Sequence, residues 1–279
     1  MKAKYPTVLT IAGSDSGGCA GIQADLKTFS ALGVFGASVI TAVTAQNTQE
    51  VRAIEILSPA IIRQQMEAVL DDITVEAIKT GMLPTPEIIE TVASIIDYYN
   101  IKNVIVDPVM VATSGARLTD SGIAEAFRKY LFTRAMLITP NIPEAETLSG
   151  IPIHTELDFQ KAAEIMIEQG CRAVLIKGGH FSKEKATDIL FDTQKGTRTV
   201  LNSTRIESEN LHGTGCTLSS AIAAYLALGK DLGNAVRMAK AYTYFAVRSG
   251  RKFITGKGYG PVNHFFYPKR MKKLKIKTE

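Results

Sequence analysis

The stretch TVLTIAGSDSGGCAGIQADLKTFSALGVFGASVITAVTAQ, residues 7–46, decides the fold class of this chain. It begins with an apolar, β-rich run, passes through a glycine-rich turn and continues as a segment of helical period, in which Ile22, Leu26 and Phe29 share one face. A second β-rich run, residues 37–46, follows. Strand, amphipathic helix and strand in this order predict two parallel strands joined by a crossover helix. We therefore expect an α/β protein.

The same alternation continues through most of the chain. Further candidate strands lie at 76–82, 102–110, 135–141 and 173–179, and candidate helices at 59–72, 86–99, 158–170, 214–229 and 231–250. Residues 186–192 and 197–206 predict a late antiparallel pair of strands. The sequence has no internal repeat and no linker, and 279 residues can form one core. We expect one domain over residues 1–268, with a mostly parallel central sheet and helices on both faces.

The net charge of +5 comes from the end of the chain. Residues 269–279 hold six Lys or Arg and one Glu, and the rest of the chain has 26 basic and 26 acidic side chains. We interpret the tail as a solvated basic segment and expect no nucleic-acid partner. No apolar run is long enough to span a bilayer, and the N-terminus leads straight into a strand pattern instead of a signal peptide. Three cysteines without metal-ligand spacing favour a reduced, cytoplasmic setting.

Polar or glycine-rich residues follow the ends of six candidate strands. They are the turn 13–18, Gln46 with Asn47, Gly81 with Met82, Asp107, Asn141 with Glu144, and Lys177 before two glycines. In a parallel α/β sheet, ligands bind beyond the carboxyl ends of the strands. We expect these residues to converge there on one site.

A seventh element of this site is the turn at 213–216. Gly213, Thr214 and Gly215 precede Cys216, which stands where a long apolar helix begins. The free N–H groups of a helix start bind anions, and their field favours a thiolate over a thiol. The alternative interpretation is that Cys216 is only a small residue at a tight helix entry.

The predicted set of groups suits phosphoryl transfer. Lys177 could hold phosphate oxygens, Glu144 and Asn141 could place Mg²⁺ through water, and the amides of 213–216 could stabilise developing charge. The sequence contains no Walker-type loop, no HExxH motif and no CxxC pair. A Walker-type nucleotide site is therefore excluded.

Eight segments, taken together, resemble a known family in order and over nearly the whole chain. They are AGSDSGGCAGIQADLKTFSALG, ITAVTAQNT, IKTGML, DPVM, TPNIPEAETL, LIKGGH, HGTGCTLSSAIAA and GKGYGPVNHF. The family is that of the bacterial hydroxymethylpyrimidine/phosphomethylpyrimidine kinases of thiamin biosynthesis, members of the ribokinase-like superfamily. The resemblance implies a ribokinase-like kinase domain over 1–268 and a homodimer. It also implies ATP- and Mg²⁺-dependent phosphorylation of 4-amino-5-hydroxymethyl-2-methylpyrimidine, and then of its monophosphate.

The resemblance also implies roles for single residues. Gln46 matches the glutamine that hydrogen-bonds the pyrimidine, Met82 and Val109 match the lining of the ring pocket, and Gly13 and Asp25 match positions near the substrate. The resemblance assigns Asn141, Thr214 and Lys177 to nucleotide binding. It assigns Glu144 and Asp107 to metal binding. Gly213, Gly215 and Lys177 join Cys216 as catalytic candidates. Cys216 matches a position that carries an aspartate base in most ribokinase-like enzymes, so we expect a thiol with a lowered pKa that acts as the base for the alcohol.

Two alternatives stay open at this point. A pyridoxine or pyridoxal kinase of vitamin B6 salvage also carries a cysteine in this turn, although VATSGARL, residues 111–118, looks like the pyrimidine-kinase segment. A binding or regulatory protein on a kinase-like fold would leave the lysine, carboxylates and thiol idle.

Overall fold

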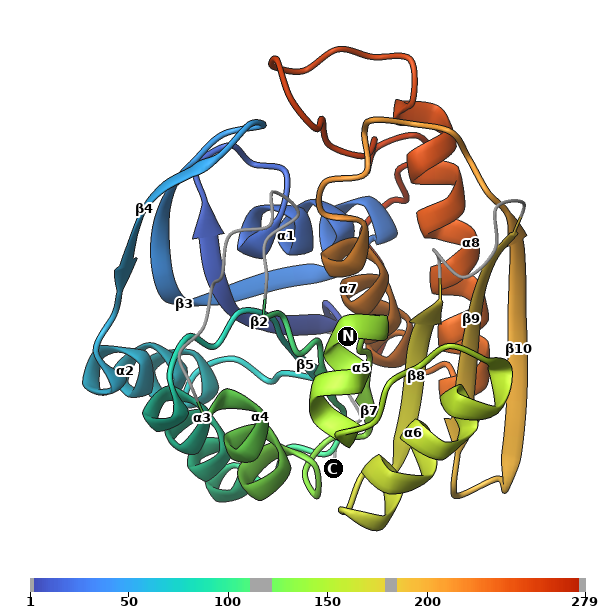
Figure 1. Cartoon of the computed structure of the whole chain (residues 1–279). Coiled ribbons are helices and arrows are strands. Elements are labelled where there is room, and N and C mark those ends of the chain that lie inside the picture. The colour runs from blue at the N-terminus through green and yellow to red at the C-terminus, as the bar shows by residue number, and fades with distance from the viewer. Residues whose placement is uncertain (1–2, 111–121, 179–184, 276–279) are drawn as a thin grey trace.

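The computed structural model describes residues 3–110, 122–178 and 185–275, and its central element is a nine-stranded sheet (Figure 1). The strands are β2 (Thr7–Asp15), β3 (Phe35–Gln46), β4 (Val51–Ile56), β5 (Ala77–Thr80), β6 (Val104–Val106), β7 (Leu137–Ile138), β8 (Ala173–Gly178), β9 (Lys185–Asp192) and β10 (Thr197–Thr204). Their order across the sheet is β10-β9-β8-β7-β6-β5-β2-β3-β4. Neighbours from β8 to β3 pair in parallel, and β4, β9 and β10 are antiparallel edges. The mostly parallel sheet and the late antiparallel pair are thus confirmed.

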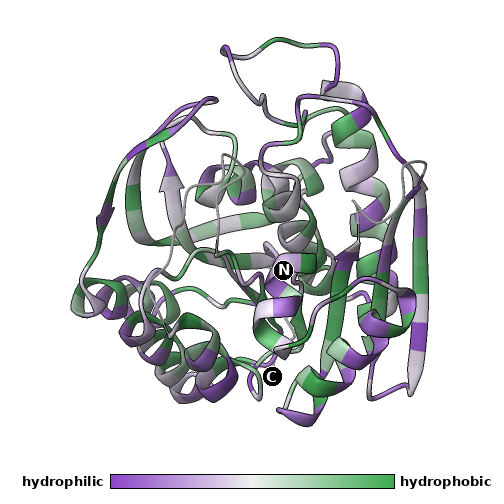
Figure 2. Ribbon diagram, in the orientation of Figure 1, coloured by the Kyte–Doolittle hydropathy of each residue, from purple (hydrophilic) through white to green (hydrophobic). Residues whose placement is uncertain are grey.

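Helices cover both faces of this sheet, as the alternation predicts (Figure 1). One face carries α1 (Gly21–Leu32), α7 (Thr214–Ala227) and α8 (Leu232–Gly250). The other carries α2 (Pro59–Leu70), α3 (Pro86–Tyr98), α4 (Ile123–Ala126) with a π-helical turn (Phe127–Leu131), α5 (Ile142–Ser149) and α6 (Glu156–Glu168). Each face has its own apolar core, and Figure 2 shows green apolar segments along the central strands and purple segments alternating with green along the outer helices.

Several helices begin at residues that satisfy free backbone N–H groups. Ser58 and Thr85 accept hydrogen bonds from the backbone N–H groups of Ile61 and Ile88, and a proline occupies the first helical position after each cap. Asn141 forms a reciprocal capping box with Glu144 at the start of α5. These caps fix where each helix leaves the edge of the sheet.

The chain changes direction across the sheet at β2. From β2 it runs through α1 to β3 on one side, whereas β5 lies on the other side of β2. The connections that leave β2 and β5 therefore diverge, and a crevice opens at the carboxyl ends of these two strands.

The described part of the basic tail is anchored by its backbone. Lys269 and Lys272 donate backbone hydrogen bonds to the carbonyls of Ala31 (2.7 Å) and Gly33 (2.8 Å) at the end of α1. Strand β11 (Leu274–Lys275) then pairs antiparallel with β1 (Ala3–Lys4). The side chains of 269–273 are exposed, as expected of a solvated basic segment. In residues 3–110, 122–178 and 185–275, no helix combines the length and apolar character needed to cross a bilayer.

Candidate active site

A cavity of about 190 Å³ opens at the carboxyl ends of β2, β5 and β6. The predicted site residues that line it are Gly13, Gln46, Met82, Asp107, Val109, Asn141, Glu144, Lys177, Gly213, Thr214, Gly215 and Cys216. The fold thus brings into one cavity groups that the sequence holds up to about 200 residues apart. The predicted residue that is absent from this wall is Asp25.

Asp25 lies beneath the cavity, in a buried ion pair. Its carboxylate is 2.9 and 3.0 Å from Lys79 Nζ, and both side chains are fully buried. Thr10 Oγ1 and Ser220 Oγ also donate to it, each over 2.6 Å. Burial alone would lower the pKa of Lys79, but the carboxylate of Asp25 holds it above its ordinary value. The residue that reaches the cavity wall is therefore Lys79, which sequence reasoning missed although a lysine inside the apolar strand AIKT signals a buried partner.

Lys177 lies between two buried carboxylates on the opposite wall. Its Nζ is 2.9 Å from Asp107 Oδ1 and 3.9 Å from Glu144 Oε2. Burial favours the neutral form of all three groups, but Lys177 and Lys79 hold the pKa of Asp107 below its usual range, and the two carboxylates raise the pKa of Lys177. For Glu144 burial dominates and raises the pKa to about 7. Two buried carboxylates thus share one ammonium group, so a further cation bound here would stabilise the ionised form of Glu144.

The carboxylate of Glu144 is held in place by the capping box of α5. Asn141 Oδ1 accepts from the Glu144 backbone N–H (2.9 Å), and Glu144 Oε2 accepts from that of Asn141 (2.8 Å). The Lys177 backbone N–H donates to Pro140 O over 2.8 Å, which ties this turn to β8. Buried carboxylate oxygens close to an amide are the donors that Mg²⁺ prefers, so Asp107 and Glu144 fit a partly hydrated Mg²⁺ ion.

The turn at the start of α7 supplies the anion-binding backbone. Gly213 has φ +82°, and a Cβ atom there would collide with the carbonyl oxygen of Cys19, so this position requires glycine. A Cβ atom on Gly215 would be 3.5 Å from Lys177 Nζ, which shows that this backbone faces the lysine. Thr214 uses its hydroxyl to close the turn, because Oγ1 donates to Leu211 O over 2.6 Å. The backbone N–H groups at this helix start and the Lys177 ammonium group thus line the same part of the cavity, where an anion could bind to both.

The prediction that the helix start lowers the pKa of Cys216 is wrong. Burial, reinforced by the charges of Asp25 and Asp107, raises that pKa from 9.0 to about 11, although Lys79 acts in the opposite direction. Such a rise corresponds to about 3 kcal/mol. A helix start contributes roughly 0.3–1 kcal/mol at exposed positions and up to about 2 kcal/mol at partly buried ones, which is too little to compensate. In this structure Cys216 is a protonated thiol at neutral pH.

Gln46 and His212 form the polar part of the remaining wall. Gln46 Nε2 lies 3.1 Å from His212 Nε2, and Gln46 Oε1 accepts from Thr44 Oγ1 over 3.3 Å. An amide nitrogen can only donate, so His212 Nε2 accepts. Burial lowers the pKa of His212 and so favours this neutral ring. Sequence reasoning missed His212; its position directly before Gly213 was the available signal.

Gly13 and Met82 come together at the bottom of this wall. A Cβ atom on Gly13 would be only 3.1 Å from Met82 Sδ. Val109 lies in the same cavity, after β6. The segment 111–118, which sequence reasoning used to distinguish the pyrimidine and pyridoxal kinases, falls outside the described residues.

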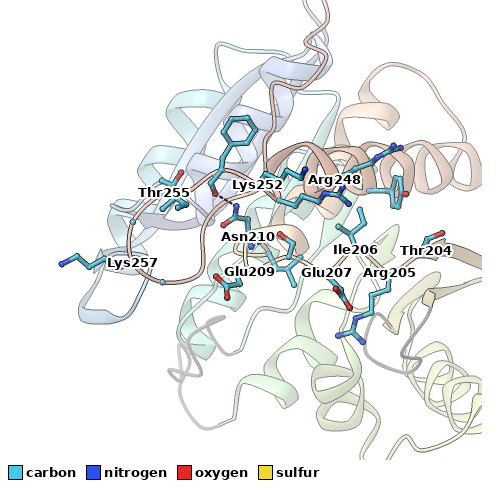
Figure 3. Close-up of a pocket in the computed structure, with 18 residues that line it drawn as sticks. Thr204, Arg205, Ile206, Glu207, Glu209, Asn210, Arg248, Lys252, Thr255 and Lys257 are labelled. Carbon is cyan, nitrogen blue, oxygen red and sulfur yellow. Dashed lines mark hydrogen bonds between the residues drawn. The ribbon is translucent and has the colours of Figure 1, made fainter.

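A larger groove of about 1660 Å³ adjoins the cavity and shares Leu211 with it (Figure 3). Residues 204–211, the end of α8 and residues 251–258 line it. Asn210 ties these segments together, since its Nδ2 donates to Gly250 O (2.7 Å) and Phe253 O (2.6 Å). The charged side chains of the lining are Arg205, Arg248, Arg251, Lys252, Lys257, Glu207 and Glu209. With five cations against two carboxylates, the groove favours anionic ligands.

Comparisons with known proteins agree with this chemistry. A family model described as phosphomethylpyrimidine kinase matches residues 15–263. The chain is 50% identical over 258 residues to the hydroxymethylpyrimidine/phosphomethylpyrimidine kinase of Rhizobium meliloti, covering 92% of this chain and 96% of that protein. It is 49% identical over 265 residues to a thiamine biosynthesis bifunctional protein of Geobacter sulfurreducens, covering 94% of this chain but 53% of that protein. The chain thus spans about half the length of the bifunctional relatives it matches.

Two kinds of solved structure are similar to this one. The crystal structure of phosphomethylpyrimidine kinase from Clostridium difficile has a TM-score of 0.76 at 48% identity, covering 86% of this chain and 99% of the other. The pyridoxal kinase from Staphylococcus aureus in complex with AMP-PCP and pyridoxal has a TM-score of 0.86 at 37% identity, covering 95% of each chain.

Proposed function

The chain belongs to the phosphomethylpyrimidine kinase family, and from this premise we propose that it is an ATP-dependent kinase of thiamin biosynthesis. It phosphorylates 4-amino-5-hydroxymethyl-2-methylpyrimidine and then the monophosphate, and the product is the diphosphate. Its sheet and helices form the ribokinase-like α/β fold of its structural neighbours. One observation carries the proposal: Lys177, the amides of 213–216 and Gln46 line a single cavity.

The Lys177 wall is the phosphoryl-transfer end of the cavity. Phosphoryl transfer depends mainly on positioning and on neutralising charge around the phosphate. Lys177 supplies a point charge to phosphate oxygens, and the backbone amides of Gly215 and Cys216 stabilise the charge that develops on the transferred group. Mg²⁺, when bound, would neutralise part of the triphosphate charge, and Asp107 and Glu144 would hold it.

The Gln46 wall is the substrate end. A carboxamide offers one donor and one acceptor, which match a ring nitrogen beside an exocyclic amine. Met82 and Val109 supply apolar surface for the ring, next to Gly13. A protonated Cys216 cannot remove the hydroxyl proton, and a loose transition state places little demand on a base. We therefore assign Cys216 to the shape and hydrogen bonding of the turn.

We propose that ATP binds along the cationic groove of Figure 3, with its anionic phosphates directed toward the catalytic cavity. The groove meets the catalytic cavity at Leu211, directly before the anion-binding turn. Arg248 and Lys252 line this groove and are the cations that we propose for the nucleotide side. If this placement is correct, Arg248→Ala raises the KM for ATP and leaves the KM for the pyrimidine unchanged; the reverse pattern contradicts it.

The experiment that tests the function supplies purified protein with Mg-ATP and one of three substrates: the hydroxymethylpyrimidine, its monophosphate or pyridoxal. ADP release and product mass are followed. We expect both pyrimidines to be phosphorylated, and Gln46→Leu to lower kcat/KM for the first pyrimidine about ten- to a hundredfold. Turnover of pyridoxal alone would support the second candidate, a pyridoxal kinase, which the TM-score of 0.86 to the Staphylococcus aureus enzyme favours. No turnover with any substrate would contradict both.

We further propose that the protein is a cytoplasmic homodimer that acts on small molecules, without a nucleic-acid or membrane partner. At the two-stranded edge β3–β4, Val43 and Ile56 are exposed apolar side chains on opposite faces of the ladder, and exposed apolar residues at a sheet edge suit a subunit contact. Sedimentation analysis of the wild type and of Ile56→Lys would test this; a monomeric wild type would contradict it.

A further inference from the structure

Asp15, Cys19 and His212 bring an oxygen, a sulfur and a nitrogen donor together beside the Gln46 wall. One potential ligand atom of each residue lies within 4.8 Å of the other two, and all three residues are buried. Asp15 is the last residue of β2, Cys19 lies in the turn that follows, and His212 precedes the turn that begins α7. We propose that these three residues bind a thiophilic divalent cation, with Zn²⁺ as the representative ion. This site is separate from the Asp107 and Glu144 carboxylates.

The set of donors selects this class of ion. Thiolate, imidazole and carboxylate are the usual ligands of Zn²⁺, whereas Mg²⁺ prefers oxygen ligands. Donor atoms around one tetrahedral Zn²⁺ lie roughly 3–4 Å apart, as follows from metal–ligand bonds of about 2.0–2.3 Å. The three donor atoms, which lie within 4.8 Å of one another, would therefore have to approach by at most about 2 Å to close the site. Cys19 would bind as the thiolate, and its proton would pass to solvent.

Asp15 is already held in one orientation. Its Oδ1 accepts from the Gly17 backbone N–H (2.8 Å), and its Oδ2 accepts from those of Cys19 (2.9 Å) and Ala20 (2.8 Å). A carboxylate has about four lone-pair positions, so one position is left for a metal. Hydrogen bonds of this kind orient metal ligands in known sites.

The segments that carry Cys19 and His212 are packed closely against each other. The Cys19 carbonyl occupies the space beside Gly213 in which a Cβ atom would lie. His212 directly precedes that glycine, and it is 6% exposed. The three donors are thus preorganised by backbone packing, which lowers the entropy that metal binding must overcome.

Binding of the metal would change the hydrogen bond between His212 and Gln46. If the ion takes Nε2, it displaces the Gln46 amide N–H that now donates there. If it takes Nδ1, Nε2 becomes protonated, and the Gln46 amide must turn its oxygen toward the ring. In both cases Gln46 presents a different pattern to the cavity. Resting on the proposed function, we infer that this ion and the aminopyrimidine antagonise each other.

The metal site can be tested without any substrate, with Co²⁺ as the probe ion and Zn²⁺ as its competitor. In Mg²⁺-free buffer, Co²⁺ should bind at one equivalent and give a thiolate-to-cobalt charge-transfer band that Zn²⁺ removes. Cys19→Ser should abolish the band, and His212→Asn should weaken Co²⁺ binding at least about tenfold. Cys171→Ser, which changes another buried cysteine at the amino end of β8, is the matched control and should keep the band.

A band that survives in Cys19→Ser, or its absence in the wild type, would overturn the proposal. Circular dichroism verifies that each variant is folded. If Cys19→Ser does not fold, the loss of Co²⁺ binding in His212→Asn provides the test instead. Zn²⁺ should also raise the apparent KM for the pyrimidine, and in Cys19→Ser this effect should be lost while turnover with Mg-ATP stays normal. If no substrate is phosphorylated but the band behaves as expected, the proposed function fails and the metal site stands.

Discussion

Replacement of Cys216 by serine tests whether the thiol acts as a base. With a pKa of about 11, about three in ten thousand Cys216 side chains are thiolates at pH 7.5. If Cys216 were a working base, it would accelerate the reaction of the alcohol about 10² to 10⁴-fold but not that of the monophosphate, which is already ionised. Because this thiol is protonated, we expect Cys216→Ser to lower kcat less than about tenfold, and by similar factors in both phosphorylation steps.

The assay measures the two turnover numbers separately across about pH 6–9, together with the rate at which iodoacetamide alkylates Cys216. We expect the kcat of the wild type and that of Cys216→Ser to depend on pH in the same way. The rate of alkylation of Cys216 in the wild type should still increase at the highest pH. The reasoning would be refuted by a loss of two or more orders of magnitude confined to the alcohol, or by an alkylation pKa below about 8. Cys171→Ser is the control for loss of a buried thiol.

Four further substitutions, at Glu144, Gly213, Gly215 and Lys79, have outcomes that the structure determines. Because burial raises the pKa of Glu144 from 4.5 to about 7, metal-free protein should lose up to about 3 kcal/mol of stability as pH rises between these values; urea unfolding of Glu144→Gln should lack this loss. Gly213→Ala should lower the free energy of unfolding by at least about 2 kcal/mol, because φ is +82° and the Cys19 carbonyl blocks a Cβ atom. Gly215→Ala should instead keep stability and lower kcat about a hundredfold, since its methyl group enters the anion site; equal stability losses would contradict this contrast. Lys79→Met should cost about 3–5 kcal/mol in urea unfolding by leaving Asp25 buried without its cation, and adding Asp25→Asn should recover most of it.

The fold was predictable where the pattern is local. The sequence identified β2, α1 and β3, because β2 is buried along almost its whole length and reads as a continuous apolar run, and the buried stripe of α1 gives a helical period before the next β-rich run. Strand β4, VRAIEI, was not identified, since it is an edge strand whose side chains are half-buried or exposed and include Arg52 and Glu55. Its pairing with β3 depends on tertiary context.

The sequence predicted many of the residues that line the cavity, but it did not predict their ion pairs or their pKa values. A polar residue at a strand end is visible in the sequence, and the parallel sheet collects such residues at one edge. The ion pair of Asp25 with Lys79 joins residues 54 positions apart, and the contact of Gln46 with His212 spans 166. Burial and the charges of Asp25 and Asp107 raise the pKa of Cys216, and neither is visible in the sequence around the helix start, which therefore suggested the wrong sign.

The order in which the cavity can form during folding follows from its discontinuous lining. Its residues extend from 12 to 216, and β5 pairs with β2 only after more than 60 intervening residues have folded back. Helices and hairpins form in microseconds, whereas pairings between distant segments are slow because they close long loops first. A refolding chain should therefore regain its circular dichroism before it regains catalysis. Recovery of turnover would report the last docking event, the arrival of the α7 turn against the first turn of the chain.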